Sequence, residues 1–282
     1  MTRLLTILLA GLLLLGFNTP QSHAVTYPTL VGHRGVGDPW TVKLGIPEQS
    51  IPAIQWAAAH HTDVVEGDVR VSGPDSSGHR VLYMMHDDTL DRTTNGSGGS
   101  YTRPWSYISQ RWLEIPVDRN GNGDPDNTSY HPPSFVKWLA AAKATRKQVF
   151  VQLKGQGWTK SLVKRYADVV TAQGMQTKVI TAGSETNLSY FRSYSSGARS
   201  WAVGHYPSAS KAKSVASYAT ISLANAEANP HYVKMLQTAG IKVFIWTLDN
   251  SGHYARALPF GAYGWMCDNT QDAWVWLEAH GA

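Results

Sequence analysis

The feature that most constrains the fold of this chain is a regular alternation of strand-like and helix-like segments. Eight short apolar runs are typical of buried strands. They begin near Thr29, Asp63, Val149, Lys178, Ser200, Ala219, Ile241 and Gly264. Amphipathic stretches that are long enough for helices separate most of these runs. Parallel strands need such helical crossovers, and eight of them can close into a barrel. The sequence therefore predicts an α/β fold, a (β/α)8 TIM barrel.

Two segments after the second strand break this alternation. Residues 79–86 alternate like a strand, but the link before them, residues 72–78, is too short for a helical crossover. We expect this segment to form an antiparallel β-hairpin with the second strand. Residues from about 91 to 133 then lack clear periodicity and are rich in Gly, Asn, Asp and Pro. The sequence predicts an irregular insertion here, of the kind that often serves as a lid or binding loop.

The first residues have the composition of an export signal. A basic residue, Arg3, precedes an apolar run over residues 4–17, and the sequence Ser22-His23-Ala24 follows. We predict a signal peptide over residues 1–24, cleaved after Ala24, which leaves residues 25–282 as one secreted domain. The alternative is a retained membrane anchor, but the run is shorter than the roughly 20 residues that span a bilayer. No later segment is long and apolar enough to be transmembrane.

Charge and cysteine content narrow the possible partners and the sources of stability. The formal net charge is +5, without clusters of Lys or Arg. A nucleic-acid-binding face usually carries more positive charge than this, whereas a weak positive field favours a small anionic substrate. With Cys267 as its only cysteine, an exported chain must fold without an internal disulfide.

Polar residues stand where several predicted strands end. His33 and Arg34 follow the first strand, and Glu66 and Asp68 fall on one face of the second. The other strand-end residues are His86 on the hairpin, Gln152 and Lys154 on the third strand, and Trp246 on the seventh. Strand ends of one barrel face converge, and buried charges persist only when they are paired or bind a metal. We therefore expect an active site here.

The order and spacing of these residues resemble the glycerophosphodiester phosphodiesterase family. The matching segments are His33-Arg34-Gly35, Pro47-Glu48-Gln49-Ser50, Glu66-x-Asp68, the run from His86-Asp87 to Asn95-Gly96, Gln152-x-Lys154, Trp246-Thr247 and Cys267-Asp268. The resemblance covers residues 32–268, which is most of the chain. It implies a phosphoric diester hydrolase with a TIM-barrel fold. Such an enzyme converts glycerophosphodiesters, free or as lipid headgroups, to glycerol phosphate and an alcohol.

The resemblance also implies roles for individual residues. His33 and His86 would be the catalytic pair that transfers protons, although the sequence leaves open which is the acid and which the base. Arg34 and Lys154 would bind the phosphoryl oxygens, and Trp246 would form a wall against the substrate.

A divalent cation is part of the same expectation. Glu66 and Asp68 would bind it, and Glu48 would act as a further ligand or would position its waters. Gln152 stands where the family has a third acidic ligand, which removes one negative charge. Metal affinity follows ligand charge, so we expect weaker binding and favour Ca²⁺ over Mg²⁺ for an extracellular protein.

Two alternative functions and one further possible ion site remain open from the sequence. A phospholipase D-like relative would release cyclic phosphates by internal attack, although such toxins generally carry a disulfide near the site. A barrel that has lost its metal would only bind wall polymers or lipid headgroups. In the insertion, residues 118–126 resemble the start of a calcium loop. Ser129 stands at its final ligand position, so a polar loop without an ion is an equal reading.

Overall fold

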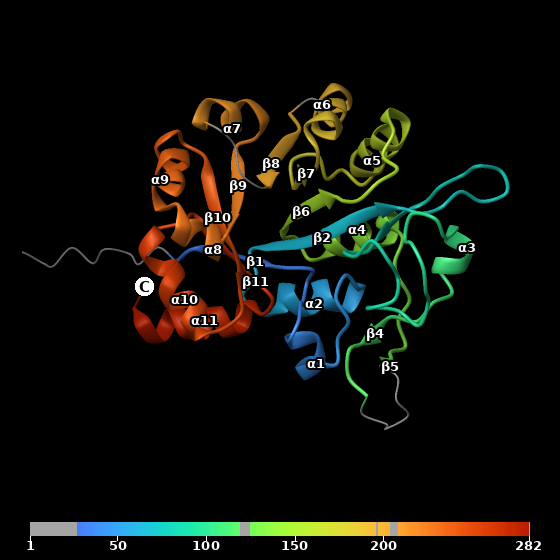
Figure 1. The fold of residues 1–282 in the computed structure, drawn as a ribbon, viewed down its shortest axis with the longest axis horizontal. Helices are drawn as coiled ribbons and strands as arrows, with labels where there is room; N and C mark the ends of the chain where they lie inside the picture. Colours follow the sequence, from blue (N-terminus) through green and yellow to red (C-terminus); the bar gives the residue numbers. More distant parts are fainter. Residues whose placement is uncertain (1–26, 119–124, 196, 204–207, 282) are drawn as a thin grey trace, which may run out of the picture.

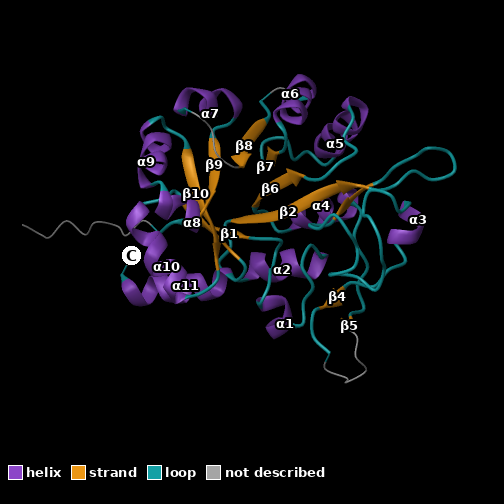
Figure 2. Cartoon of the chain, viewed as in Figure 1, coloured by secondary structure: helices purple, strands orange, loops and turns teal. Residues whose placement is uncertain are grey.

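The computed structural model describes residues 27–118, 125–195, 197–203 and 208–281. Within them, eight parallel strands close into a barrel (Figures 1 and 2). In barrel order they are β1 (Thr29–Gly32), β2 (Val64–Val71), β6 (Gln148–Leu153), β7 (Val179–Ala182), β8 (Arg199–Val203), β9 (Tyr218–Ser222), β10 (Lys242–Leu248) and β11 (Gly264–Cys267). The barrel closes because β1 pairs with both β11 and β2. The predicted TIM-barrel fold is confirmed.

Helices surround the strands, as Figure 1 shows. They are α1 (Trp40–Leu44), α2 (Ile51–Ala59), α4 (Phe135–Ala144), α5 (Lys160–Ala172), α6 (Glu185–Tyr194), α7 (Ala209–Val215), α8 (Leu223–Ala228), α9 (Pro230–Thr238), α10 (Ser251–Ala257), the 3-10 turn η1 (Leu258–Phe260) and α11 (Thr270–His280). Several begin at a side-chain cap. The Ser184 hydroxyl, for example, accepts a hydrogen bond from the backbone N–H of Asn187 at the start of α6.

The start of the first long helix differs from a simple reading of the sequence. Pro47 followed by Glu48 is typical of a first helical turn, and the sequence alone therefore predicts a helix from Pro47, but α2 begins at Ile51. The Ser50 hydroxyl accepts the backbone N–H of Ala53 and caps the helix. The residue before the cap, Gln49, has a left-handed φ of 61°, which an α-helix cannot contain. Glu48 therefore lies in an irregular turn, where it can approach the barrel mouth.

The hairpin and the insertion follow β2 as expected. Strand β3 (Leu82–Met84) pairs antiparallel with β2, with Arg70 opposite Tyr83. The insertion contains α3 (Trp105–Ile108) and a two-stranded ribbon of β4 (Glu114–Ile115) and β5 (Asp126–Asn127). Figure 1 shows these elements together at one side of the barrel. The remainder of the described insertion is irregular.

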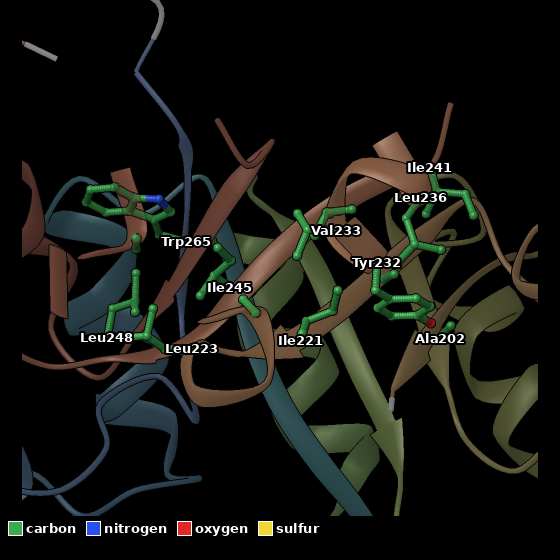
Figure 3. Close-up of a cluster of buried hydrophobic side chains, with 14 of the residues drawn as sticks. Ala202, Ile221, Leu223, Tyr232, Val233, Leu236, Ile241, Ile245, Leu248 and Trp265 are labelled. Atoms are coloured by element: carbon green, nitrogen blue, oxygen red, sulfur yellow. The ribbon is translucent and has the colours of Figure 1, made fainter. Parts of the chain in front are cut away.

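Apolar side chains fill the barrel and the layer outside it. Inside, Phe150, Trp201 and Phe244 are almost fully buried, and the ring of Phe150 meets the other two edge-on at centroid distances of 4.2 and 5.2 Å. Outside, residues of β9 to β11 such as Ile221 and Trp265 pack against the covering helices (Figure 3). This packing holds the strand ends at fixed positions.

Two sequence expectations fall on residues that the structure does not describe. The predicted signal peptide, residues 1–24, lies outside the described residues, as do positions 119–124 of the possible calcium loop. In the part of the chain that is described, no helix has the length and apolar character needed to cross a membrane.

Candidate active site

A cavity of about 120 Å³ lies at the carboxyl ends of the strands and gathers most of the residues singled out in the sequence. Its lining consists of His33, Arg34, Glu66, Asp68, His86, Gln152, Lys154, Trp201, Thr220, Trp246 and Met266. Of the predicted site residues, only Glu48 is not part of this lining. The cavity is smaller than the roughly 300–1,000 Å³ of pockets for drug-sized ligands, which suits a small polar substrate.

The turn after β1 brings the first two site residues to the cavity. Arg34 and Gly35 both have left-handed backbone conformations, with φ of 55° and 75°. A side chain at Gly35 would collide with the backbone of α2 at Ala53, so glycine lets the turn and the helix approach closely. The backbone N–H of His33 donates to the carbonyl of Cys267 at 2.9 Å, which ties the turn to β11.

Each predicted catalytic histidine is paired with an aspartate through Nδ1. His33 Nδ1 lies 2.6 Å from Oδ1 of Asp268, and His86 Nδ1 lies 2.7 Å from Oδ1 of Asp87. Because both Nδ1 atoms are engaged, Nε2 is the atom that each ring has left for a substrate. Burial, together with the charge of Arg34, lowers the pKa of His33 to about 3, so this ring is uncharged near pH 7.

Arg92 and Glu48 form a charged support behind the cavity. The Arg92 guanidinium donates to both oxygens of Asp87, at 2.5 and 3.0 Å, and to both oxygens of Glu48, at 2.7 and 3.1 Å. Glu48 also accepts from Arg34 Nη1 at 3.1 and 3.3 Å. Glu48 is thus a buried carboxylate held between two guanidinium groups. This arrangement lets Glu48 position Arg34 beside the cavity.

The two carboxylates of β2 lie side by side in the cavity. Both are buried, with Glu66 2% and Asp68 1% exposed. Gln49 holds Asp68 at two points: its Nε2 donates to Oδ2 at 2.6 Å, and its Oε1 accepts the Asp68 backbone N–H at 3.0 Å. The backbone N–H of Arg34 donates to Glu66 at 2.8 Å. Burial, and then the neighbouring charge of Asp68, raises the pKa of Glu66 to about 8.

This carboxylate pair fits a hard divalent cation, although with few charged ligands. Two buried carboxylates lie together here, and the charge of Asp68 adds to burial in raising the pKa of Glu66, while Lys154 Nζ lies 3.5 Å from Asp68 Oδ1. Oxygen donors of this kind suit Ca²⁺ or Mg²⁺. Gln152 is next to Asp68 in strand register and can add only a neutral oxygen. Among the described residues, no group of three or more His, Cys, Asp or Glu side chains is placed to hold a metal.

Several site residues were not assigned a role from the sequence. Trp201, Thr220 and Met266 line the cavity, and their only sequence signal is a position inside or near the end of a predicted strand. Asp268 directly follows the last strand, and a carboxylate at a barrel strand end is a signal that can be recognised. The ion pairs of Arg92 with Glu48 and Asp87 become evident only in the folded chain, which brings the segment after His86 next to Glu48.

Comparisons with known proteins identify the family of the chain. Residues 33–180 match the model of the Glycerophosphoryl diester phosphodiesterase family. A Bacillus subtilis (strain 168) protein, YhdW, which is named for the same activity, is 35% identical over 69 residues. That match spans about a quarter, 24%, of each of the two chains.

Solved structures share the fold over nearly their whole length. A glycerophosphodiester phosphodiesterase from Agrobacterium tumefaciens superposes with a TM-score of 0.68 at 23% identity, covering 87% of this chain and 98% of the other. An Oleispira antarctica phosphodiesterase, solved with the product sn-glycerol-3-phosphate, gives 0.69 at 17% identity, covering 89% and 97%. At these identities the likeness establishes the fold, and the family model, which matches more than half of the residues, establishes the family. The chain therefore belongs to the glycerophosphoryl diester phosphodiesterase family, as the motifs of its sequence indicate.

Proposed function

We propose that this protein hydrolyses glycerophosphodiesters to glycerol phosphate and an alcohol, with His33 and His86 as the proton-transfer pair. The observation that carries the proposal is that two histidines, each fixed by an aspartate at Nδ1, line one cavity together with Arg34 and Lys154. General acid–base transfer by such a pair is worth roughly 10²–10⁴-fold in rate.

The surroundings of the two rings support different roles for them. His33 is neutral because burial lowers its pKa, so it can accept a proton at Nε2 from the attacking water. His86 faces the Asp87 carboxylate, whose pKa lies below its ordinary value because His86 and Arg92 outweigh the effect of burial. We assign to His86, held at Nδ1 by this ionised aspartate, the donation of a proton to the leaving alkoxide. A P–O bond to water forms while the P–O bond to the alcohol breaks.

The remaining lining residues bind and orient the phosphodiester. Arg34 and Lys154 stabilise charge on the phosphoryl oxygens. Glu66 and Asp68, with Gln152 as a neutral donor, would hold the divalent cation, Ca²⁺ in preference to Mg²⁺, and a bound ion would supply further positive charge near the phosphate. Glu48 contributes by orienting Arg34.

Two tryptophans form the wall on which the organic part of the substrate rests. Trp201 and Trp246 both line the cavity, and their indole N–H groups are buried without a hydrogen-bond partner in the described part of the protein. Unpaired buried donors are costly. We expect hydroxyls of the glycerol moiety, or ordered water, to accept from them.

The direct test follows the products. The purified protein is incubated with glycerophosphocholine and Ca²⁺, with and without chelator, and the phosphorus products are followed by NMR. Glycerol 3-phosphate that disappears with chelator supports the proposal. A cyclic phosphate would instead indicate the internal attack of a phospholipase D-like enzyme. No turnover of any diester would indicate a barrel that only binds wall polymers or lipid headgroups.

A matched set of variants tests the two histidines. We expect His33→Ala and His86→Ala each to lower kcat by about 100-fold or more. His79→Ala is the control, because this histidine lies exposed in the β2–β3 hairpin loop and its side chain is 74% exposed. Near-full activity in either active-site variant would refute the acid–base assignment.

We also propose that residues 1–24 are a cleaved signal peptide and that the barrel, with its insertion at about residues 91–133, is exported. The composition of the first residues supports this. Expression of the whole chain, followed by N-terminal sequencing of protein from the medium, tests it. A mature protein that starts at Val25 is the expected result, and an unprocessed chain in the membrane fraction would refute it.

A further inference from the structure

A second, partly buried carboxyl group lies behind His33, and the proposed function leaves it without a role. Asp249 directly follows β10 and Asp268 directly follows β11, and the preceding residues of the two strands, Leu248 and Cys267, are register partners. Adjacent parallel strands in this register place the next two residues side by side. The carboxyl groups of Asp249 and Asp268 interact in this position.

We infer that Asp249 and Asp268 form a carboxyl pair that shares one proton and positions the ring of His33, which makes Asp249 a positioning residue for the reaction. The inference rests on the proposed function of His33. It goes beyond it by assigning a role to a residue that contacts neither the cavity nor the ring.

The geometry leaves the pair little freedom. Asp268 is 6% exposed, and its Oδ1 makes the 2.6 Å bond to His33. A side chain at Gly37 would collide with the Asp268 carboxyl, so the β1 turn packs directly against it. Asp249 Oδ1 is buried, and no donor in the described part of the chain forms a hydrogen bond to it. These constraints keep the two acids together.

The charges around the pair favour one retained proton. Two carboxylates in contact, Asp268 buried and Asp249 partly buried, cannot both ionise easily. Within the described part of the chain neither forms a salt bridge with a lysine or arginine; Asp268 pairs with His33, and His253 Nδ1 lies 4.0 Å from Asp249 Oδ2. Burial, followed by the charge of Asp268, raises the pKa of Asp249 to about 7, and burial raises that of Asp268 to about 7. The titratable and charged groups that face the pair are His33, Arg34, Asp38, Glu48, His253, Tyr254 and Cys267.

The support of the other histidine is different. Asp87 beside His86 is held by Arg92 and is ionised. The pair beside His33 has one negative charge in total while it holds its proton. That charge accepts the Nδ1–H of neutral His33 and stabilises the ring after it takes a proton from water. Loss of the shared proton changes the electrostatic environment of the ring near neutrality.

The first test observes the pair in the whole protein and needs no substrate. Aspartate is labelled with ¹³C, and the carboxyl carbons are followed by NMR from about pH 4 to 10, with assignments from Asp249→Asn and Asp268→Asn. We expect the two carbons to shift together in steps near pH 7. Two carboxyl groups that both titrate below about pH 4.5, as free aspartates do, would overturn the inference, whether or not the protein hydrolyses glycerophosphocholine.

The second test uses kinetics with glycerophosphocholine. Asp249→Asn is expected to lower kcat by about tenfold, with KM within about twofold, and to lose the inflection of kcat/KM near pH 7. Asp272→Asn is the matched control, because Asp272 accepts from Tyr254 and does not contact His33. An unchanged pH profile in Asp249→Asn would show that the pair does not act on His33. Complete inactivity of the unmodified protein would refute the proposed function, and the NMR titration would still decide the pair.

Discussion

The weakest point of the proposed metal site is the neutral Gln152, so restoring a charge there is the most informative perturbation. Gln152 is the register partner of Asp68 on the neighbouring strand, so about 4.8 Å separates the two backbones. Gln152→Glu would add a third carboxylate beside Glu66 and Asp68. The isosteric change alters the charge with little change in volume.

Gln152→Glu is expected to be unfavourable in the absence of the ion and favourable when the ion is bound. Without a cation, a like charge at roughly 5 Å and an effective dielectric constant of about 20 costs about 3 kcal/mol. In a domain of this size that corresponds to a loss of roughly 6–12 °C in Tm. With the ion bound, one more charged ligand raises the affinity about 10- to 100-fold, which equals about 1.4–2.8 kcal/mol.

The assay is a calorimetric Ca²⁺ titration of each protein, combined with thermal unfolding at pH 8 in chelator and in excess Ca²⁺. Gln148→Glu is the control, because it makes the same change on β6 at the opposite mouth of the barrel, beside Asp63. It should leave Ca²⁺ affinity unchanged. If Gln152→Glu also binds Ca²⁺ no more tightly than the unmodified protein, Gln152 does not face the ion and the charge argument is wrong.

Three further predictions concern the supports of the two histidines. Arg92→Ala removes one of the two guanidinium partners of buried Glu48, and we expect the free energy of unfolding in urea to fall by about 2 kcal/mol. The pKa of Asp87 is lowered in the folded state by Arg92 and the adjacent histidine, so its stabilising contribution is present above the ordinary pKa of 3.8 and is lost as the pH falls below it. In urea titrations from about pH 7 to 2, the stability difference between the unmodified protein and Asp87→Asn should therefore shrink, and a constant difference would contradict the assignment. Gly37→Ala would displace the Asp268 carboxyl, and we expect kcat to fall by about tenfold while the circular dichroism spectrum is retained.

The sequence by itself determined the architecture and most of the cavity lining. Eight apolar runs separated by helical stretches permit few other closed folds, because buried parallel strands need both faces covered. The polar exceptions at strand ends, such as His33 and Asp68, were visible because ionisable residues interrupt otherwise apolar segments. Strand periodicity of two was enough to place Glu66 on the same face as Asp68.

Only the tertiary structure decided how these groups are connected. Glu48 was expected near a metal, and a left-handed turn at Gln49 brings it between Arg34 and Arg92. The pairing of Asp249 with Asp268 depends on the register between β10 and β11, two strands that are far from His33 along the chain. Local sequence sets periodicity and turns, whereas hydrogen-bond partners and pKa values depend on distances of a few ångströms that barrel closure fixes. The protonation states on which the chemistry depends are therefore a property of the closed barrel.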